Sequence, residues 1–467
     1  MNKYILLAVV VVFVSFFTSF FLPAGGVYRD SLSYFEIAAD LPNPVTDLFP
    51  LGYPILVRGF QLLFGDYFWA YKMLNVTMLI IVFLFSYLKQ FYFRETVLLF
   101  MGKTMLFVFS IALSEAPFLF LMYFLIYFLH KILIDKTYSK TDVIIASVIM
   151  VMMFIVRYSG IYIYLAIGVF AMYLLIKSNN REVFWSFVLF LIISGLGIAS
   201  YLGYNYYNYK SYTGEDLRGA PYPMTGVSLL RNILGVINAA NPFFGVKPAS
   251  SSVVSIGFQI VVAIVDIFIL RYFILIFKKS RSRSDHNFYI LLWIISGVYA
   301  ISLLLSGWTQ QIEEMNTRMM AAANVCLFFS FLIIYFKNES SDKKLLRVSV
   351  LFLIFFLLYT LKSPEYYFYN RKQVEQQMSK FSSKRFIYDD IEEETTLTTY
   401  RFLFINKAFH YKHSNNQNGD IKRQIAGTLD PKKKWLMHDT VTDKSKVLYT
   451  SQIKLNQNKK PQKTDEQ

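Results

Sequence analysis

Long apolar runs are the feature that most constrains this chain. About eleven of them precede residue 362, and most approach the roughly 20 residues that a helix needs to cross a hydrocarbon core about 30 Å thick. In lipid such runs are stable as helices, whose backbone groups bond to one another. The sequence therefore predicts an all-α polytopic membrane protein. The runs lie near residues 4–22, 67–88, 96–113, 116–134, 143–156, 159–176, 184–205, 253–277, 288–305, 319–336 and 346–361.

The composition agrees with a membrane protein and excludes other classes. Charged residues make up 17% of the chain, whereas soluble proteins have about 25%. A net charge of +16 would suggest nucleic-acid binding in a soluble protein. Here most basic residues lie beside apolar runs, so we expect membrane lipids and no nucleic acid as partners. The single cysteine, Cys326, excludes an intramolecular disulfide and a cysteine-built metal cluster.

Basic loops predict the orientation. If the N-terminus is cytoplasmic, every loop on that side carries Lys or Arg close to a span, which is the known bias of cytoplasmic loops. The outer side then holds the loops at about 23–66 and 206–252, joints near 114 and 157, and the joint 306–318. Since no retrieval signal is visible, a bacterial cytoplasmic membrane is favoured over the endoplasmic reticulum.

The composition changes once, after the last apolar run. Residues 1–362 form the predicted membrane domain. From Ser363 to Gln467 the apolar runs vanish, which predicts a small soluble tail on the outer side. Its first part has enough Phe, Tyr and Ile to pack a small domain, whereas the polar stretch from Asn456 predicts disorder.

Charged side chains at the outer ends of the spans are the best candidates for chemistry, because ionisable groups are costly near lipid. They come from separate stretches of the chain, and we expect one polar cavity on the outer side to collect them. These residues are Arg29, Asp30, Glu36, Asp40, Asp47, Arg58, Glu115, Arg157, Glu313, Glu314 and Arg318.

The first outer loop, at about 23–66, is the most informative of these stretches. Asp30, Tyr34 and Ala38 are spaced by four residues, which puts them on one face of a short helix along the membrane surface. The structural alternative is that Asp30 or Ser33 is a helix N-cap, with Ser33 and Glu36 forming a capping box.

A second bend in this loop reads Pro50-Leu51-Gly52-Tyr53-Pro54 and opens another short apolar stretch. Two prolines around a glycine fix a bend rather than a straight span. Tyr53 therefore belongs either to an ordinary turn within the loop or to a surface that shapes a substrate site.

Four motifs, taken in order, resemble the GT-C class of multi-span glycosyltransferases, which includes protein O-mannosyltransferases and the bacterial aminoarabinose transferase of lipid A. The resemblance covers about the first 180 residues, with a weaker match at Asn316-Thr317-Arg318. The motifs are Asp30-Ser31-x-x-Tyr34, the Pro50-Leu51-Gly52-Tyr53-Pro54 turn, Ser114-Glu115-Ala116-Pro117 and Arg157-Tyr158-Ser159-Gly160.

This resemblance implies transfer of a sugar from a polyprenyl-phosphate carrier to a lipid, glycan or protein acceptor on the outer face. The class uses an Asp of the first outer loop as its essential carboxylate, and that role falls on Asp30. An acidic residue at the outer start of a later span assists it, and Glu115 matches that place. Several relatives have Glu where this chain has Ser31 and Asp where it has Glu115, so metal dependence and the acceptor stay open.

The chemistry gives the same residue types a role independently. A hydroxyl or amine becomes a good nucleophile when a carboxylate takes its proton, which is worth roughly 10²–10⁴-fold in rate, and Asp30 is the candidate base. A leaving lipid phosphate needs positive charge, supplied either by Arg157 and Arg318 or by Mg²⁺ or Mn²⁺ held by Asp30 and Glu115. Tyr34, Tyr53 and Glu313 complete the predicted substrate-binding set.

Several of these residues also have a structural interpretation. Glu115 fits a helix start, where an acid offsets the helix dipole. Arg157 fits a side chain that snorkels to lipid head groups. Glu314 and Arg318, four residues apart, fit a surface ion pair.

Two other functions stay open. A transporter or lipid flippase would place charges near mid-span, and here the acidic residues gather at outer ends; Asp266, deep in a late span, fits a pair with Arg271. A polysaccharide polymerase or ligase would share the outer site and use a large late loop, as the loop at about 206–252 allows.

Overall fold

The computed structural model describes most of the membrane domain and three short pieces of the tail. The described residues are 2–44, 47–64, 67–135, 138–177, 181–217, 221, 223, 225–245, 253–281, 283–339, 341–361, 386–388, 409–411 and 436–438. The soluble character, outer location and disordered end predicted for the tail fall on residues outside this set, apart from three strands.

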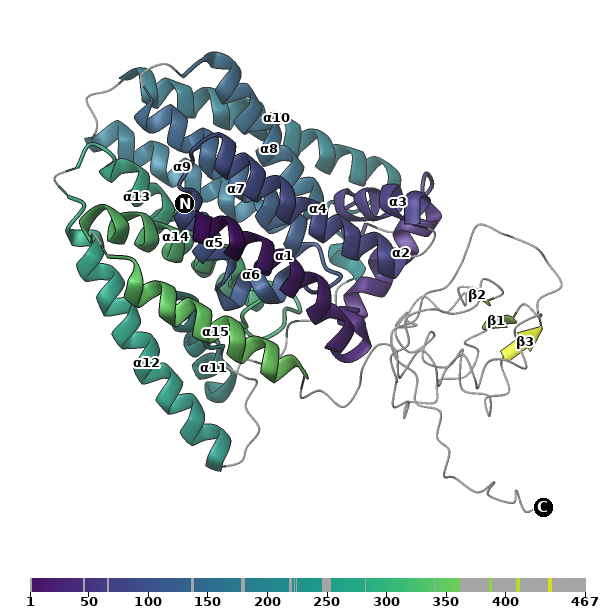
Figure 1. Ribbon diagram of the computed structural model, residues 1–467. Coiled ribbons are helices and arrows are strands. Elements are labelled where there is room, and N and C mark those ends of the chain that lie inside the picture. The colour runs from purple at the N-terminus through teal and green to yellow at the C-terminus, as the bar shows by residue number, and fades with distance from the viewer. Residues whose placement is uncertain are drawn as a thin grey trace.

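Helices form nearly all of the described structure (Figure 1). They are α1 (Asn2–Phe21), α2 (Arg29–Asp40), α3 (Gly52–Phe64), α4 (Tyr67–Leu88), α5 (Phe93–Phe100), α6 (Lys103–Val108), α7 (Glu115–Ile134), α8 (Lys140–Val156), α9 (Gly160–Lys177), α10 (Arg181–Tyr209), α11 (Gly226–Ile237), α12 (Val253–Lys278), α13 (His286–Thr309), α14 (Ala321–Asn338) and α15 (Lys343–Leu361). Short 3₁₀ turns lie at Pro23–Gly26, Glu215–Leu217 and Asn238–Ala240. In the tail, β1 (Phe386–Tyr388) pairs with β2 (Phe409–Tyr411) in parallel and with β3 (Leu436–His438) antiparallel.

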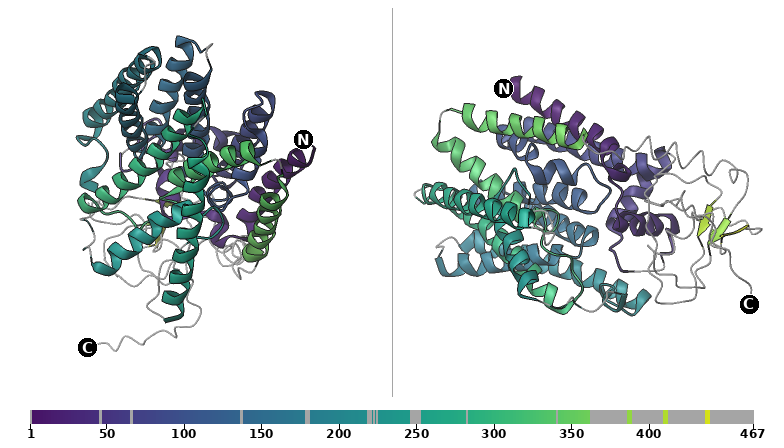
Figure 2. Two further views of the ribbon diagram at one scale, coloured as in Figure 1. Left: turned by 90° about the vertical axis from the view of Figure 1, so that its left-hand side faces the viewer. Right: turned by 90° about the horizontal axis from the view of Figure 1, so that it is seen from below.

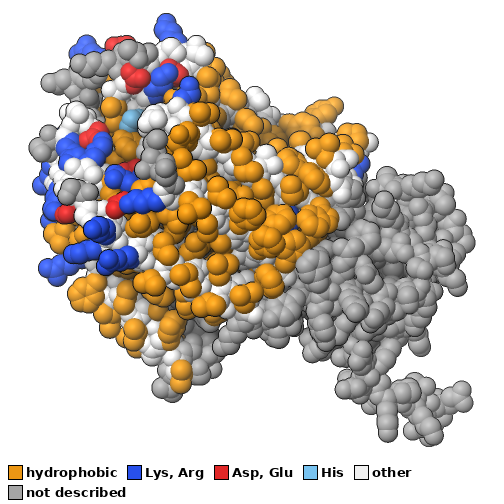
Figure 3. Space-filling view, viewed as in Figure 1, with side chains coloured by type: hydrophobic (Ala, Val, Ile, Leu, Met, Phe, Trp, Pro, Cys, Tyr) orange, Lys and Arg blue, Asp and Glu red, His pale blue; other side chains and the backbone are white. Residues whose placement is uncertain are grey.

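Nine of the described helices are long and apolar enough to cross a membrane, which makes the protein an integral, multi-pass membrane protein. The prediction of an all-α polytopic fold is confirmed. In Figure 3, hydrophobic side chains cover most of the visible face, while Lys and Arg gather at one end. The nine helices are α1, α4, α7, α9, α10, α12, α13, α14 and α15.

The other two predicted runs take different forms. Run 143–156 lies in α8, which has 17 residues and packs against α7 and α10. Run 96–113 is broken into α5, α6 and an irregular joint, and nearly all of its residues are buried. Non-helical backbone at membrane depth is tolerated where protein surrounds it, which explains why this segment can depart from one continuous helix.

Contacts between residues at or near helix ends show which ends lie together at each end of the bundle. At one end, Lys3 in the first turn of α1 pairs with Asp342 before α15 at 2.5 Å, and Lys337 at the end of α14 pairs with Asp285 before α13. Towards the other end, Asn75 in the first half of α4 donates to the carbonyl oxygen of Ile111, in the joint before α7, at 3.0 Å. The helix ends that lie together are those that the predicted topology puts on the same side of the membrane. Which of the two sides faces the cytoplasm stays a prediction.

The helices differ in how much protein surrounds them. α14 is enclosed along almost its whole length, whereas α12 and α15 expose most of their side chains and lie at the edge of the bundle (Figure 2). Their exposed side chains are largely Ile, Leu, Val and Phe, as expected for contact with lipid.

The first outer loop contains two short helices, as predicted, and α2 packs against α3. α2 begins at Arg29, where the backbone N–H of Tyr28 donates to the side-chain oxygen of Ser31 at 2.9 Å. The capping interpretation is therefore wrong for both residues: Asp30 and Ser33 lie inside α2, and the capping contact uses Ser31.

The glycine of the second bend is required by close packing. A Cβ at Gly52 would lie 2.7 Å from the carbonyl oxygen of Ile155, near the end of α8. The absence of a side chain thus lets the start of α3 lie against the end of α8, which brings the first outer loop to the joint at Arg157.

Candidate active site

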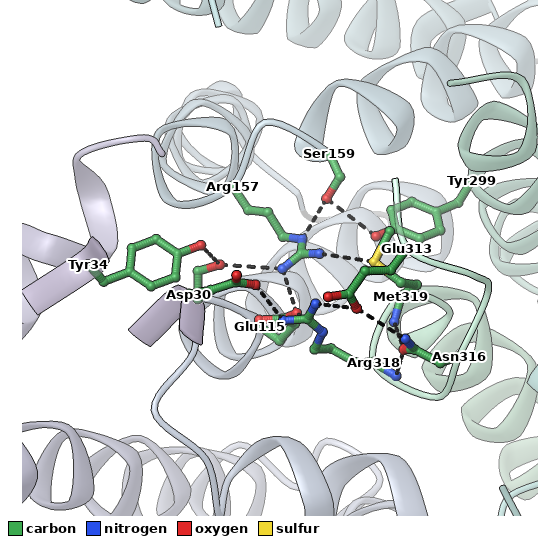
Figure 4. A network of polar contacts seen from close by, with 11 residues as sticks. Asp30, Tyr34, Glu115, Arg157, Ser159, Tyr299, Glu313, Asn316, Arg318 and Met319 are labelled. Carbon is green, nitrogen blue, oxygen red and sulfur yellow. Dashed lines mark hydrogen bonds and ion pairs between the residues drawn. The ribbon is translucent and has the colours of Figure 1, made fainter. Parts of the chain in front are cut away.

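Five charged side chains from four distant stretches of the chain meet at the end of the bundle that holds α2 (Figure 4). Asp30 comes from the first turn of α2, Glu115 begins α7, and Arg157 follows α8. Glu313 and Arg318 come from the segment between α13 and α14. All five are among the residues predicted from the sequence.

Arg318 is the centre of the cluster. Its Nη1 lies 2.9 Å from Oδ2 of Asp30, its Nε 3.3 Å from Oε1 of Glu115, and its Nη2 2.8 Å from Oε2 of Glu313. Burial alone would lower the pKa of Arg318, but the three carboxylates outweigh burial and raise it. One guanidinium thus donates hydrogen bonds to Asp30 and Glu313 and forms an ion pair with Glu115.

An asparagine turn orients Arg318. The side-chain oxygen of Asn316 accepts hydrogen bonds from the backbone N–H groups of Arg318 and Met319, each at 3.0 Å. Such a side-chain turn fixes the backbone just before α14 begins at Ala321. The weak Asn316-Thr317-Arg318 match therefore marks the turn that aims the central arginine.

Arg157 holds the other side of Glu115. Its Nη1 lies 2.7 Å from Oε1 of Glu115, and its Nε donates to Oγ of Ser159 at 3.0 Å. Burial would lower the pKa of Arg157, but Glu115 raises it. The snorkelling interpretation is wrong, because the guanidinium points into the protein and pairs with a buried acid.

Glu115 links the two arginines. Its side chain is 2% exposed and lines neither cavity described below. It also begins α7, so its predicted helix-start role and its place in the cluster coexist. Its geometry suits charge compensation and positioning, whereas Asp30, 25% exposed, is the carboxylate that can reach a substrate.

Tyr34 and Tyr53 differ in whether they line a cavity: Tyr34 lines the smaller one and Tyr53 does not. The hydroxyl of Tyr34 lies 2.7 Å from Oγ of Ser114, and burial raises its pKa. The Tyr53 ring packs edge-on against Tyr34 at 4.9 Å, is fully buried and lines neither cavity. The prediction of direct substrate contact is therefore corrected for Tyr53, which supports the Tyr34 ring.

Other outer charges lie away from the cluster, so the expectation that one cavity collects them all is wrong. Asp47 accepts a hydrogen bond from the backbone of Gly214 at 3.0 Å, and Arg58 donates to Gln61 at 2.7 Å. The side chains of Arg29, Glu36 and Asp40 lie outside the described residues.

Two predicted ion pairs are also corrected. Glu314 pairs with Arg231 of α11 at 3.0 Å, not with Arg318, because the segment before α14 is not helical at this point. Asp266 accepts hydrogen bonds from Asn238 and Asn241 at 2.7 and 2.6 Å, not from Arg271.

Lys103 is a site residue that the sequence reasoning missed. Its ammonium group donates to Oδ1 of Asn238 and to the carbonyl oxygen of Phe244, both at 2.6 Å, and it lines a cavity beside Arg318. The available signal was a single lysine inside the apolar run 96–113.

Two cavities meet at the cluster, and Asp30, Glu313 and Arg318 line both. The larger, of about 800 Å³, is lined mainly by aromatic and aliphatic side chains of α6, α12, α15 and the segment before α12. The smaller, of about 580 Å³, has aromatic rings together with Ser159, Thr213, Gln310 and Gln311. The cluster therefore lies between an apolar and a more polar compartment.

The predicted metal ligands are bridged by a guanidinium. Arg318 contacts both Asp30 and Glu115, the two carboxylates proposed to hold Mg²⁺ or Mn²⁺. Within the part of the chain that the structure describes, there is no group of three or more His, Cys, Asp or Glu side chains arranged to hold a metal ion.

Comparison with known proteins gives limited similarity. No family model and no curated protein matches the sequence. Among solved structures, the fold is similar to that of the Archaeoglobus fulgidus oligosaccharyltransferase in complex with Zn and sulfate, with 11% identity, a TM-score of 0.44, and coverage of 80% of this chain and 56% of that chain. This chain thus spans little more than half the length of that enzyme, and the functional assignment depends on the site itself.

Proposed function

We propose that this protein is a glycosyltransferase that moves a sugar from a polyprenyl-phosphate-linked donor to an acceptor on the outer face of the membrane. The observation that carries the proposal is the position of Asp30. Its carboxylate is accessible, is held by Arg318, and lines both an apolar and a polar cavity. A donor and an acceptor bound on either side would bring their reacting atoms to this residue.

The apolar cavity suits the lipid part of the donor. Phe107, Phe258 and Phe355 are among its lining residues, and they come from helices α6, α12 and α15. Since α12 and α15 expose apolar side chains, a polyprenyl chain can pass from the bilayer into this cavity without crossing water.

The cations of the same cavity suit the leaving phosphate. Arg318 and Lys103 both line it, and preorganised cations stabilise charge that develops in a transition state. Each terminal nitrogen of Arg318 carries two hydrogens and has one carboxylate partner, so hydrogens remain for a phosphate oxygen.

The chemical step is a direct displacement. The acceptor oxygen forms a bond to the anomeric carbon while the bond from that carbon to the phosphate oxygen breaks. The acceptor proton passes to Asp30, and the electron pair of the broken bond leaves with polyprenyl phosphate. Direct attack predicts inversion at the anomeric carbon.

The location of the cavities favours this chemistry over transport. A translocation path needs access from both ends of the bundle. The lining residues of these two cavities come from the end that holds α2 and from the adjoining halves of the helices. Charges gathered at one end suit a reaction at one membrane surface.

Sugar transfer by the purified protein in liposomes tests the proposal. The donor is the radiolabelled lipid-linked sugar fraction from the cells that produce the protein, and the acceptors are their glycans, lipids and proteins. We expect labelled product of inverted configuration and release of polyprenyl phosphate. Thr317→Trp, in the apolar cavity, should raise KM for the donor, whereas Val227→Trp, at an exposed position of α11, should not. Wild-type protein that releases no sugar from any donor would refute the proposal.

A further inference from the structure

The smaller cavity has its own chemistry, which bears on the acceptor. It contains no part of α12 or α15, the two lipid-exposed helices that line the larger cavity. Its walls include the rings of Phe49, Tyr158 and Tyr162 and the amides of Gln310 and Gln311. Aromatic rings can pack against the C–H face of a sugar ring, and amides can form hydrogen bonds with its hydroxyls.

The wall of this cavity is cross-linked by hydrogen bonds between loops. The hydroxyl of Tyr158 donates to the carbonyl oxygen of Asp47 at 2.8 Å, and Asp47 accepts from the backbone of Gly214 at 3.0 Å. Asn205 donates both to the Tyr158 hydroxyl and to the carbonyl oxygen of Tyr212, at 3.0 and 2.8 Å. These contacts fix the wall in advance, and about 580 Å³ is a usual size for a small-molecule site.

The charges beside the cavity disfavour an anionic acceptor. Three carboxylates face two guanidiniums in the cluster, so its formal charge is −1. All three nitrogens of Arg157 have partners, namely Ser159, Glu115 with Ser114, and Met319. An acidic acceptor would meet the carboxylates of Asp30 and Glu313 in this cavity, and the remaining hydrogens of Arg318 are those that the proposed function assigns to the donor phosphate.

Building on the proposed function, we infer that the acceptor is a neutral saccharide whose ring lies among Phe49, Tyr162 and Gln311 and whose hydroxyl reaches Asp30. Tyr162 has its hydroxyl held by Ser306 and presents its ring to the cavity wall. Gln311 is an exposed amide at the same cavity. The amides and hydroxyls of its lining distinguish this cavity from the larger one, whose mainly apolar lining suits a lipid chain.

The test offers three acceptor classes to wild-type protein in liposomes with the labelled lipid-linked sugar fraction. They are neutral octyl glycosides of glucose, galactose and N-acetylglucosamine, the matched octyl glucuronide, and a Ser/Thr-rich peptide. We expect label on a neutral glycoside and at least a tenfold lower kcat/KM for the glucuronide. Label mainly on the glucuronide, the peptide or endogenous lipid overturns the inference and leaves the proposed function standing, whereas no release of sugar from any donor overturns both.

Two variants separate the acceptor site from the donor site. Gln311→Ala, at an exposed position that should not affect folding, and Tyr162→Ala should each raise KM for the glycoside about tenfold and leave donor KM unchanged. Phe355→Ala, which lines only the apolar cavity, should show the reverse pattern. An unchanged glycoside KM in Gln311→Ala and Tyr162→Ala would contradict the assignment.

Discussion

Arg318 and Asp30 are 288 residues apart in the chain and form an ion pair of 2.9 Å. The pair joins the segment before α14 to the first turn of α2, and Glu115 and Glu313 use the remaining nitrogens of the same guanidinium. The contact keeps the Asp30 carboxylate at the boundary between two cavities.

Arg318→Lys should reduce sugar transfer by at least 10²-fold although the positive charge is kept. An ammonium group has one nitrogen, whereas the three carboxylates contact three separate nitrogens of the guanidinium. Initial rates with the lipid-linked donor measure the effect. Arg231→Lys is the matched control, because Arg231 pairs with Glu314 outside the cluster, and it should retain wild-type activity. Equal rates for Arg318→Lys and wild type would show that the three-way contact is dispensable.

Glu115→Gln should lower the free energy of unfolding by more than the same substitution at an exposed site. The change leaves two arginines facing each other without their buried common partner, and breaking a buried pair costs about 3–5 kcal/mol. The double variant Glu115→Gln/Arg157→Gln should recover part of that loss, since it removes one unpaired charge. Denaturant unfolding in detergent measures both. Strictly additive effects of the two changes would contradict the proposed coupling.

A chelator should leave the activity of the purified protein largely intact. Arg318 already lies between the two carboxylates that were the candidate metal ligands, and in the proposed mechanism it supplies the positive charge that the leaving phosphate needs. Transfer rates are compared before and after EDTA treatment, and again after addition of Mg²⁺ or Mn²⁺. Loss of activity that either ion restores would assign the charge compensation to a metal instead.

Glu215 should stabilise its turn in a pH-dependent way. Desolvation opposes the shift, but hydrogen bonds from the backbone N–H groups of Tyr212 and Thr213 lower the pKa of Glu215 from 4.5 to about 2. The stabilisation is thus complete above about pH 4.5 and disappears as the pH falls towards 2. The Tm difference between wild type and Glu215→Gln should be largest at neutral pH and shrink over that window. A difference that grows on acidification would contradict this sign.

The helices could be predicted from the sequence because lipid imposes their length and composition directly. The charged site residues could also be found, since ionisable groups at span ends are costly and therefore few. What the sequence did not reveal was their pairing. Glu313 and Glu314 are adjacent, yet one contacts Arg318 and the other Arg231, because the chain here is irregular and the four-residue spacing of a helix does not apply.

Features that depend on tertiary packing could not be predicted from the sequence either. Tyr53 looked like a candidate for substrate contact, but the close approach of α3 to the end of α8 buries it behind Tyr34. Lys103 lies inside the apolar run 96–113 and was given no role, whereas it donates to Asn238, more than 130 residues away. Neither contact leaves a local pattern in the sequence.

The most direct test of the account is the rate of sugar transfer by Asp30→Asn under single-turnover conditions, with donor binding measured in the same preparation. The amide keeps the shape of the side chain but cannot act as a base at neutral pH. The account predicts at least a 10²-fold slower transfer with donor binding retained. Transfer at the wild-type rate by a folded Asp30→Asn protein would contradict it.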